Sequence, residues 1–78
     1  MHHPAITIDP EIMCGTPVFT GTRVPLKNLF DYLETGDTLD NFLADFDWVK
    51  REHALQVIAM SNKALLQILP VLDENFVG

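Results

Sequence analysis

The sequence lacks the features that usually stabilise or anchor a small protein. Its single cysteine, Cys14, excludes an internal disulfide, and no cysteine–histidine pair has the spacing of zinc ligands. Every apolar run is shorter than the roughly 20 residues that a membrane-spanning helix needs. We therefore expect residues 1–78 to form a single soluble domain that holds no metal or cofactor and gains stability by forming oligomers.

Basic residues are also scarce. The 5 lysines and arginines stand against 11 acidic residues, which gives a formal net charge of −6. Because nucleic-acid binding depends on cations that neutralise phosphates, this balance argues against extensive contact with DNA. An acidic domain is better suited to a basic protein partner. Residues 1–4 lack the basic and apolar regions of a signal peptide, so we expect a cytoplasmic protein.

The period of the apolar pattern changes near residue 25. Within residues 6–24, two short runs, Ile6–Ile8 and Val18–Thr20, are separated by turn-forming residues, which predicts a β-hairpin. Residues 25–69 have apolar residues at helical spacing. The sequence thus predicts a mainly α fold with a short N-terminal β-hairpin and a tri-helical, helix-turn-helix-like unit with a long third helix. It leaves open whether the β segment pairs within the chain or across a dimer.

The first two predicted helices are joined at Gly36, which suits the residue just past a helix end. Thr38 then serves as the N-cap of the second helix. The third helix is predicted over about 50–69, with Pro70 as its stop. Ala54, Val57 and Leu65 are expected to face the core.

Further apolar residues widen the surface of the third helix beyond a single stripe. A monomer of this size cannot cover all of it, which predicts a homodimer or a second protein lying on this helix. Leu55 and Leu66 are the candidate contacts on the helix. Residues 70–78 are expected to form an extended C-terminal arm, in which Asp73 and Phe76 complete the set of candidate partner-binding residues.

The few cations give the candidate DNA contacts. Lys50 and Arg51 stand at the start of the third helix, and Lys27 lies on the first. A plain solvated helix face explains the same charges. His53 has no acid, nucleophile or metal ligand at a telling spacing, and Cys14 has no activating base and is expected to be an inert, at least half-buried thiol. We therefore predict no enzyme and no catalytic residue.

The most distinctive stretch runs from residue 15 to residue 25, where glycine and proline bracket a short strand. We expect its glycines to adopt positive φ and its arginine to tie the corner to a carboxylate or to helix carbonyls. An anion site at the arginine is the alternative. The residues of this structural motif are Gly15, Pro17, Gly21, Thr22 and Arg23.

With Ile8-Asp9-Pro10 before it, this stretch resembles the hallmark of a small prokaryotic family, domain of unknown function 433. The hallmark reads Gly-x-Pro-x-x-x-Gly-Thr-Arg-[Ile/Val] ahead of a tri-helical unit, and the resemblance covers roughly residues 6–61. Some members are VapB-like antitoxins encoded beside a PIN-like ribonuclease toxin. The resemblance implies a non-catalytic, homodimeric antitoxin that neutralises such a nuclease by binding it and also binds operator DNA. The alternative is a dimeric structural or regulatory interaction module without DNA binding.

Trp48 lies in the predicted connector between the second and third helices. Two roles are open for it. It either fills the corner between the helices or, if it is exposed, provides the large rigid aromatic group that interface hot spots use.

Overall fold

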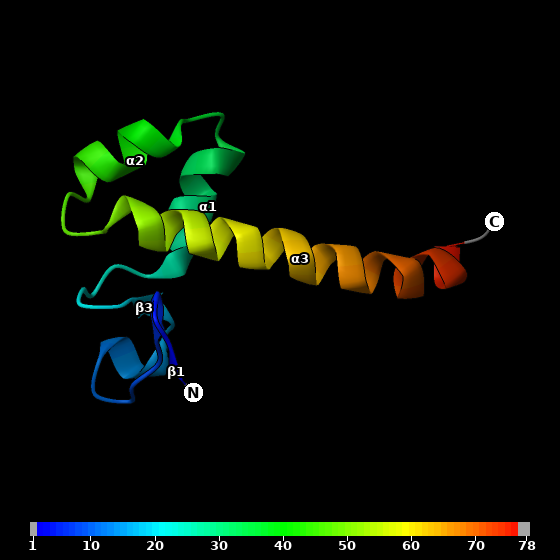
Figure 1. The fold of residues 1–78 in the computed structure, drawn as a ribbon, viewed down its shortest axis with the longest axis horizontal. Coiled ribbons are helices and arrows are strands. Elements are labelled where there is room, and N and C mark those ends of the chain that lie inside the picture. The colour runs from blue at the N-terminus through cyan, green and yellow to red at the C-terminus, as the bar shows by residue number, and fades with distance from the viewer. Residues whose placement is uncertain (1, 77–78) are drawn as a thin grey trace.

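A computed structural model describes the backbone of residues 2–76 and the side chains of residues 3–68. The described chain is mainly helical, with helices α1 (Leu26–Glu34), α2 (Leu39–Asp45) and α3 (Arg51–Phe76) after a small N-terminal sheet. In Figure 1 the sheet, α1 and α2 gather around the first half of α3, and the second half of α3 projects away from them. The predicted fold class is confirmed.

The sheet is antiparallel and forms within one chain. Strand β2 (Ile6–Thr7) pairs with β3 (Val18–Phe19), with Ile6 opposite Phe19 and Thr7 opposite Val18. This pairing answers the question that the sequence leaves open. The sequence did not predict a third strand, β1 (His2–His3), which pairs with the outer edge of β2.

Local capping explains where the first two helices begin and end. α1 starts at Leu26, one residue after Pro25, where the helical pattern of the sequence begins. Beyond the C-terminal end of α1, the Asp37 N–H donates to the Tyr32 carbonyl at 2.9 Å. The hydroxyl of Thr38 accepts from the Asn41 N–H at 3.1 Å, so the predicted N-cap of α2 is confirmed. Side-chain capping of this kind typically contributes about 1 kcal/mol.

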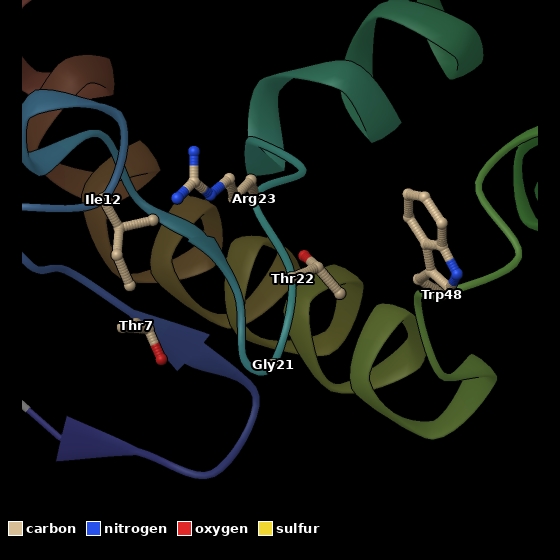
Figure 2. A pocket seen from close by; sticks show the side chains of 6 residues that line it. All are labelled: Thr7, Ile12, Gly21, Thr22, Arg23 and Trp48. Atoms are coloured by element: carbon tan, nitrogen blue, oxygen red, sulfur yellow. The ribbon is translucent and has the colours of Figure 1, made fainter.

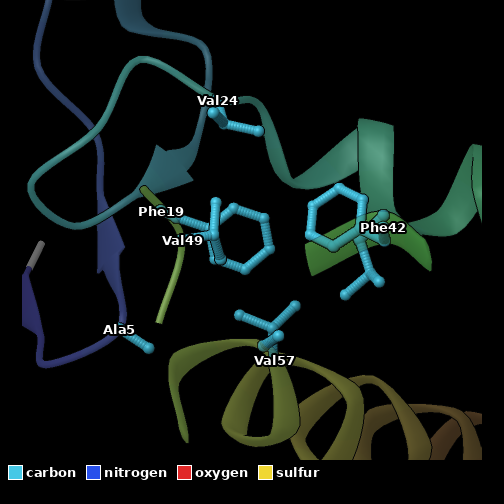
Figure 3. Close-up of a cluster of buried hydrophobic side chains, with 8 residues drawn as sticks. Ala5, Phe19, Val24, Phe42, Val49 and Val57 are labelled. Atoms are coloured by element: carbon cyan, nitrogen blue, oxygen red, sulfur yellow. The ribbon is translucent and has the colours of Figure 1, made fainter. Parts of the chain in front are cut away.

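The core lies where the sheet meets all three helices, as Figure 3 shows. Phe42 of α2 is fully buried, and its ring centroid lies 5.9 Å from that of Phe19 and 5.0 Å from that of Phe46. The predicted core residues Ala54 and Val57 are both buried against this cluster. Burial of these side chains is the main force that holds the short strands and helices together.

The prediction that Leu65 faces the core is wrong, because its side chain is 52% exposed. Among residues 51–68, the α3 side chains in the core cluster or packed against it, Ala54, Val57 and Ile58, all come from the first half of the helix, and every residue from 61 to 68 is exposed. The spacing of apolar residues shows which face of a helix is apolar, but it does not show how far along the helix other elements pack on that face.

The predicted end of the third helix at Pro70 is also wrong, and so is the extended arm over residues 70–76. The α3 backbone continues through Pro70 to Phe76. A proline inside a helix removes one backbone donor and strains the preceding turn, but helices can bend around it. Its flanks contain leucine and glutamate, which have good helix propensity.

Candidate partner-binding surfaces

The corner between β3 and α1 is held by Thr22. Its backbone N–H and its hydroxyl both donate to the Phe19 carbonyl, at 3.0 and 2.8 Å, and its hydroxyl accepts from the Val24 N–H at 3.0 Å. Gly21 before it has a φ of +82°, which a side chain would make strained. Gly21 and Thr22 therefore both shape the backbone of this corner.

The role predicted for Arg23 is wrong. Within the described residues its guanidinium group forms no hydrogen bond or ion pair, and the side chain is exposed. The threonine hydroxyl already satisfies the corner, so the arginine is free to point outward. The remaining motif residues do act structurally, since Gly15 has a φ of +85° and the Pro17 carbonyl accepts from the Leu26 N–H at 3.1 Å.

Arg23 lies on an open cleft of about 470 Å³, which we call the Trp48 cleft (Figure 2). Trp48 is 82% exposed, whereas the next residue, Val49, is buried in the core. The connector turns at this point, because the Val49 N–H donates to the Phe46 carbonyl at 3.0 Å. Because its side chain is exposed, Trp48 does not fill the corner between α2 and α3, which was one of the two roles open for it. The cleft is lined by Thr7, Ile12, Gly21, Thr22, Arg23 and Trp48.

A strained turn lies next to this cleft. Met13 and Cys14 have φ values of 51° and 57°, in the left-handed region that side chains disfavour. Such residues cost on the order of 1–3 kcal/mol each and concentrate at functional sites. The turn follows directly on Ile12, which lines the cleft. The thiol of Cys14 is exposed, so the prediction of a half-buried cysteine is wrong.

A second open surface, which we call the α3 groove, runs between α1 and α3. Leu55, predicted to contact a partner, lines this groove and is 49% exposed, whereas Leu66, the other predicted contact with a described side chain, is 59% exposed but does not line it. The side chains of the other two predicted contacts, Asp73 and Phe76, lie outside the described part of the chain. The groove is lined by Phe30, Leu55, Ile58, Ala59, Ser61, Asn62 and Leu65.

The predicted DNA-contacting residues do not form a free basic patch. The Arg51 guanidinium is paired with the Asp40 carboxylate. On a different helix, the Lys27 ammonium lies 2.8 Å from an Asp31 oxygen, and this hydrogen bond raises the pKa of Lys27. Lys50 is exposed and forms no ion pair within the described residues. DNA binding stays a prediction.

Other chemistry is limited in residues 3–68. No three histidine, cysteine or acidic side chains among the described residues are close enough to hold a metal ion. The Nδ1 atom of His53 is buried, without a hydrogen-bond partner in the described part. A search of the described helices for one long and apolar enough to cross a membrane found none.

Comparison with known proteins gives one match. A family model described as a protein of unknown function (DUF433) matches residues 6–59, which include strands β2 and β3, the Thr22 corner, α1, α2 and the first turns of α3. No curated protein and no solved structure matches the chain. The match contains the whole Trp48 cleft and stops before the projecting half of α3.

Proposed function

The chain belongs to the DUF433 family, and we propose that it is a non-catalytic, antitoxin-like protein that neutralises a PIN-like nuclease by binding it at the Trp48 cleft. The observation that carries this proposal is the 82% exposure of Trp48 on a cleft shared with Arg23. Tryptophan and arginine are the residue types most enriched among interface hot spots.

The energetics of the cleft favour a protein ligand. Trp48 adds nothing to the described core, so its exposed ring is available for burial by a partner. Arg23 has no ion pair among the described residues, so pairing with a partner's carboxylate would break no internal contact. The open shape of the cleft suits a protruding loop better than an enclosed small molecule. Neutralisation would then be steric.

The proposal requires a PIN-like nuclease encoded beside this chain, and the test uses that nuclease. We expect the two purified proteins to co-elute in size-exclusion chromatography, and RNA cleavage by the nuclease to fall to background once the chain is equimolar. The same nuclease mixed with an unrelated acidic protein of similar size is the control. Full RNA cleavage in the presence of excess chain, with separate elution of the two proteins, would disprove the proposal.

The described charges argue against an operator-binding role for this antitoxin-like protein. Arg51 is paired with Asp40, and Asp47 and Glu52 stand beside it with exposed carboxylates. We therefore expect no salt-dependent affinity for the chain's own upstream DNA. A real phosphate-contacting mode shows a negative dependence of log affinity on log salt. Lys50→Ala would reduce that slope, whereas the matched variant Lys63→Ala, further along α3, would not.

A further inference from the structure

The described side chains in the projecting half of α3, those of residues 61–68, lack tertiary cover. All side chains from residue 61 to residue 68 are exposed, and the apolar residues Leu65, Leu66 and Ile68 are each at least 50% exposed. Isolated helices shorter than about 12–15 residues are marginal in water, because packing of an apolar face provides most helical stability. A partner that buries these apolar side chains would therefore stabilise this half of α3.

The face that needs cover continues into the α3 groove. Leu55, Ile58, Asn62 and Leu65 follow one another at spacings of three, four and three residues, which is the a and d spacing of a coiled coil. These four residues all line the groove, whose other wall includes Phe30 of α1. The groove therefore has the residue pattern that accepts a second helix.

We propose that a second copy of this chain occupies the α3 groove, with the two α3 helices antiparallel and crossing near Asn62. In this arrangement the projecting half of each helix lies in the groove of the other protomer. One two-fold axis thereby covers both uncovered surfaces at once, as an isologous interface requires. α3 has 26 residues and is about 39 Å long, so the pairing is extensive.

Charge selects the antiparallel direction. The last turns of α3 contain Asp73 and Glu74 and no basic residue, whereas Lys50 and Arg51 stand at its start. Parallel helices would bring the four acidic residues of the two copies together. Antiparallel helices place each acidic end near Lys50 of the second copy, which forms no ion pair among the described residues, and near the positive end of that copy's helix dipole.

Asn62 is the polar member of the stripe and lies near its middle. A single asparagine at a coiled-coil core position fixes register and oligomeric state at some cost in stability. Near the two-fold axis its amide can meet the same amide of the second copy, which supplies both a donor and an acceptor. The interface shares no residue with the Trp48 cleft, so it does not depend on the proposed function.

Sedimentation equilibrium tests whether the dimer forms. We expect the unmodified chain to be a dimer and Leu65→Glu to raise the dissociation constant roughly 100-fold or more, because two charges are forced into the interface. Gln67→Glu adds the same charge to another exposed position of α3 and should leave the dimer intact. Near-ultraviolet circular dichroism verifies that the core of each variant is folded. A monomeric unmodified chain, or equal effects of the two variants, would overturn the proposal.

Disulfide trapping tests the direction of the helices. Cys14 is exposed and is first replaced by serine. In that background Asn62→Cys should form a disulfide-linked dimer under mild oxidation, because the position lies near the axis. Leu55→Cys should not, because antiparallel helices keep its two copies far apart. Efficient cross-linking of Leu55→Cys would show parallel helices, and failure of both variants in a dimeric protein would show that another surface forms the dimer; either result refutes the antiparallel pairing.

Discussion

Replacing Phe42 with alanine is expected to lower the free energy of unfolding by about 3–5 kcal/mol. Phe42 is fully buried and contacts three aromatic rings, from Phe19 of the sheet, Tyr32 of α1 and Phe46 after α2. Alanine would remove the side chain that joins these elements and leave a cavity. The loss is a large share of the stability of a small domain, so the variant should be partly unfolded at 37 °C.

Urea unfolding, followed by the signal of the aromatic side chains, measures this loss. The protein concentration must be the same for all variants, because dimer formation would add to the apparent stability. Phe42→Leu preserves most of the volume and should cost less than about 1.5 kcal/mol. Leu33→Ala, at a half-exposed position of α1, should have a smaller effect than Phe42→Ala. Equal effects of alanine and leucine at position 42 would mean that the aromatic cluster is not the centre of the core.

Much of the fold follows from local sequence signals. The change of period near residue 25 separates the sheet from the helices, and Thr38 sets the start of α2 through a hydrogen bond to Asn41. Gly21 adopts a positive φ, a backbone conformation that residues with a side chain disfavour. Each of these signals acts over a few residues, which is why the sequence alone reveals it. The contact between Phe19 and Phe42 joins residues far apart in the chain, and no local pattern announces it.

The differences between the sequence-based predictions and the structure have specific physical causes. Arg23 was expected to hold the corner, but the smaller Thr22 hydroxyl already satisfies the Phe19 carbonyl and the Val24 N–H. Pro70 was expected to end the third helix, although a proline removes only one helical hydrogen bond. The left-handed turn at Met13 has no sequence signature, because neither it nor Cys14 prefers that conformation.

The sequence also does not show whether the Trp48 side chain points toward the core or toward solvent. Trp48 and Val49 are adjacent apolar residues in a connector, and only one of them can face the core. The smaller side chain is the one that is buried. As a result the candidate site combines a residue of the connector with a residue of the Gly-Thr-Arg segment, and the two are 25 positions apart in the sequence. The sequence marks both residues as candidates, but no local pattern places them at one site.

Replacing Trp48 with alanine is expected to weaken binding of the nuclease by at least about 2 kcal/mol, or roughly 30-fold. The stability of the chain itself should be nearly unchanged, because the side chain is 82% exposed and belongs to no described core cluster. Isothermal titration calorimetry measures the affinity, and thermal unfolding measures the stability. This separation of binding from folding distinguishes a hot spot from a structural residue.

Further variants at the cleft and a control away from it make the result specific. Trp48→Phe keeps a flat aromatic group and should retain part of the affinity, whereas Leu33→Ala removes an exposed apolar side chain that does not line the cleft and should have no effect. Arg23→Ala should also weaken binding, and the double variant with Trp48→Ala measures whether the two residues act together. Unchanged affinity in Trp48→Ala would exclude the cleft as the binding site. The dimer interface would be unaffected by that result, because it uses other residues.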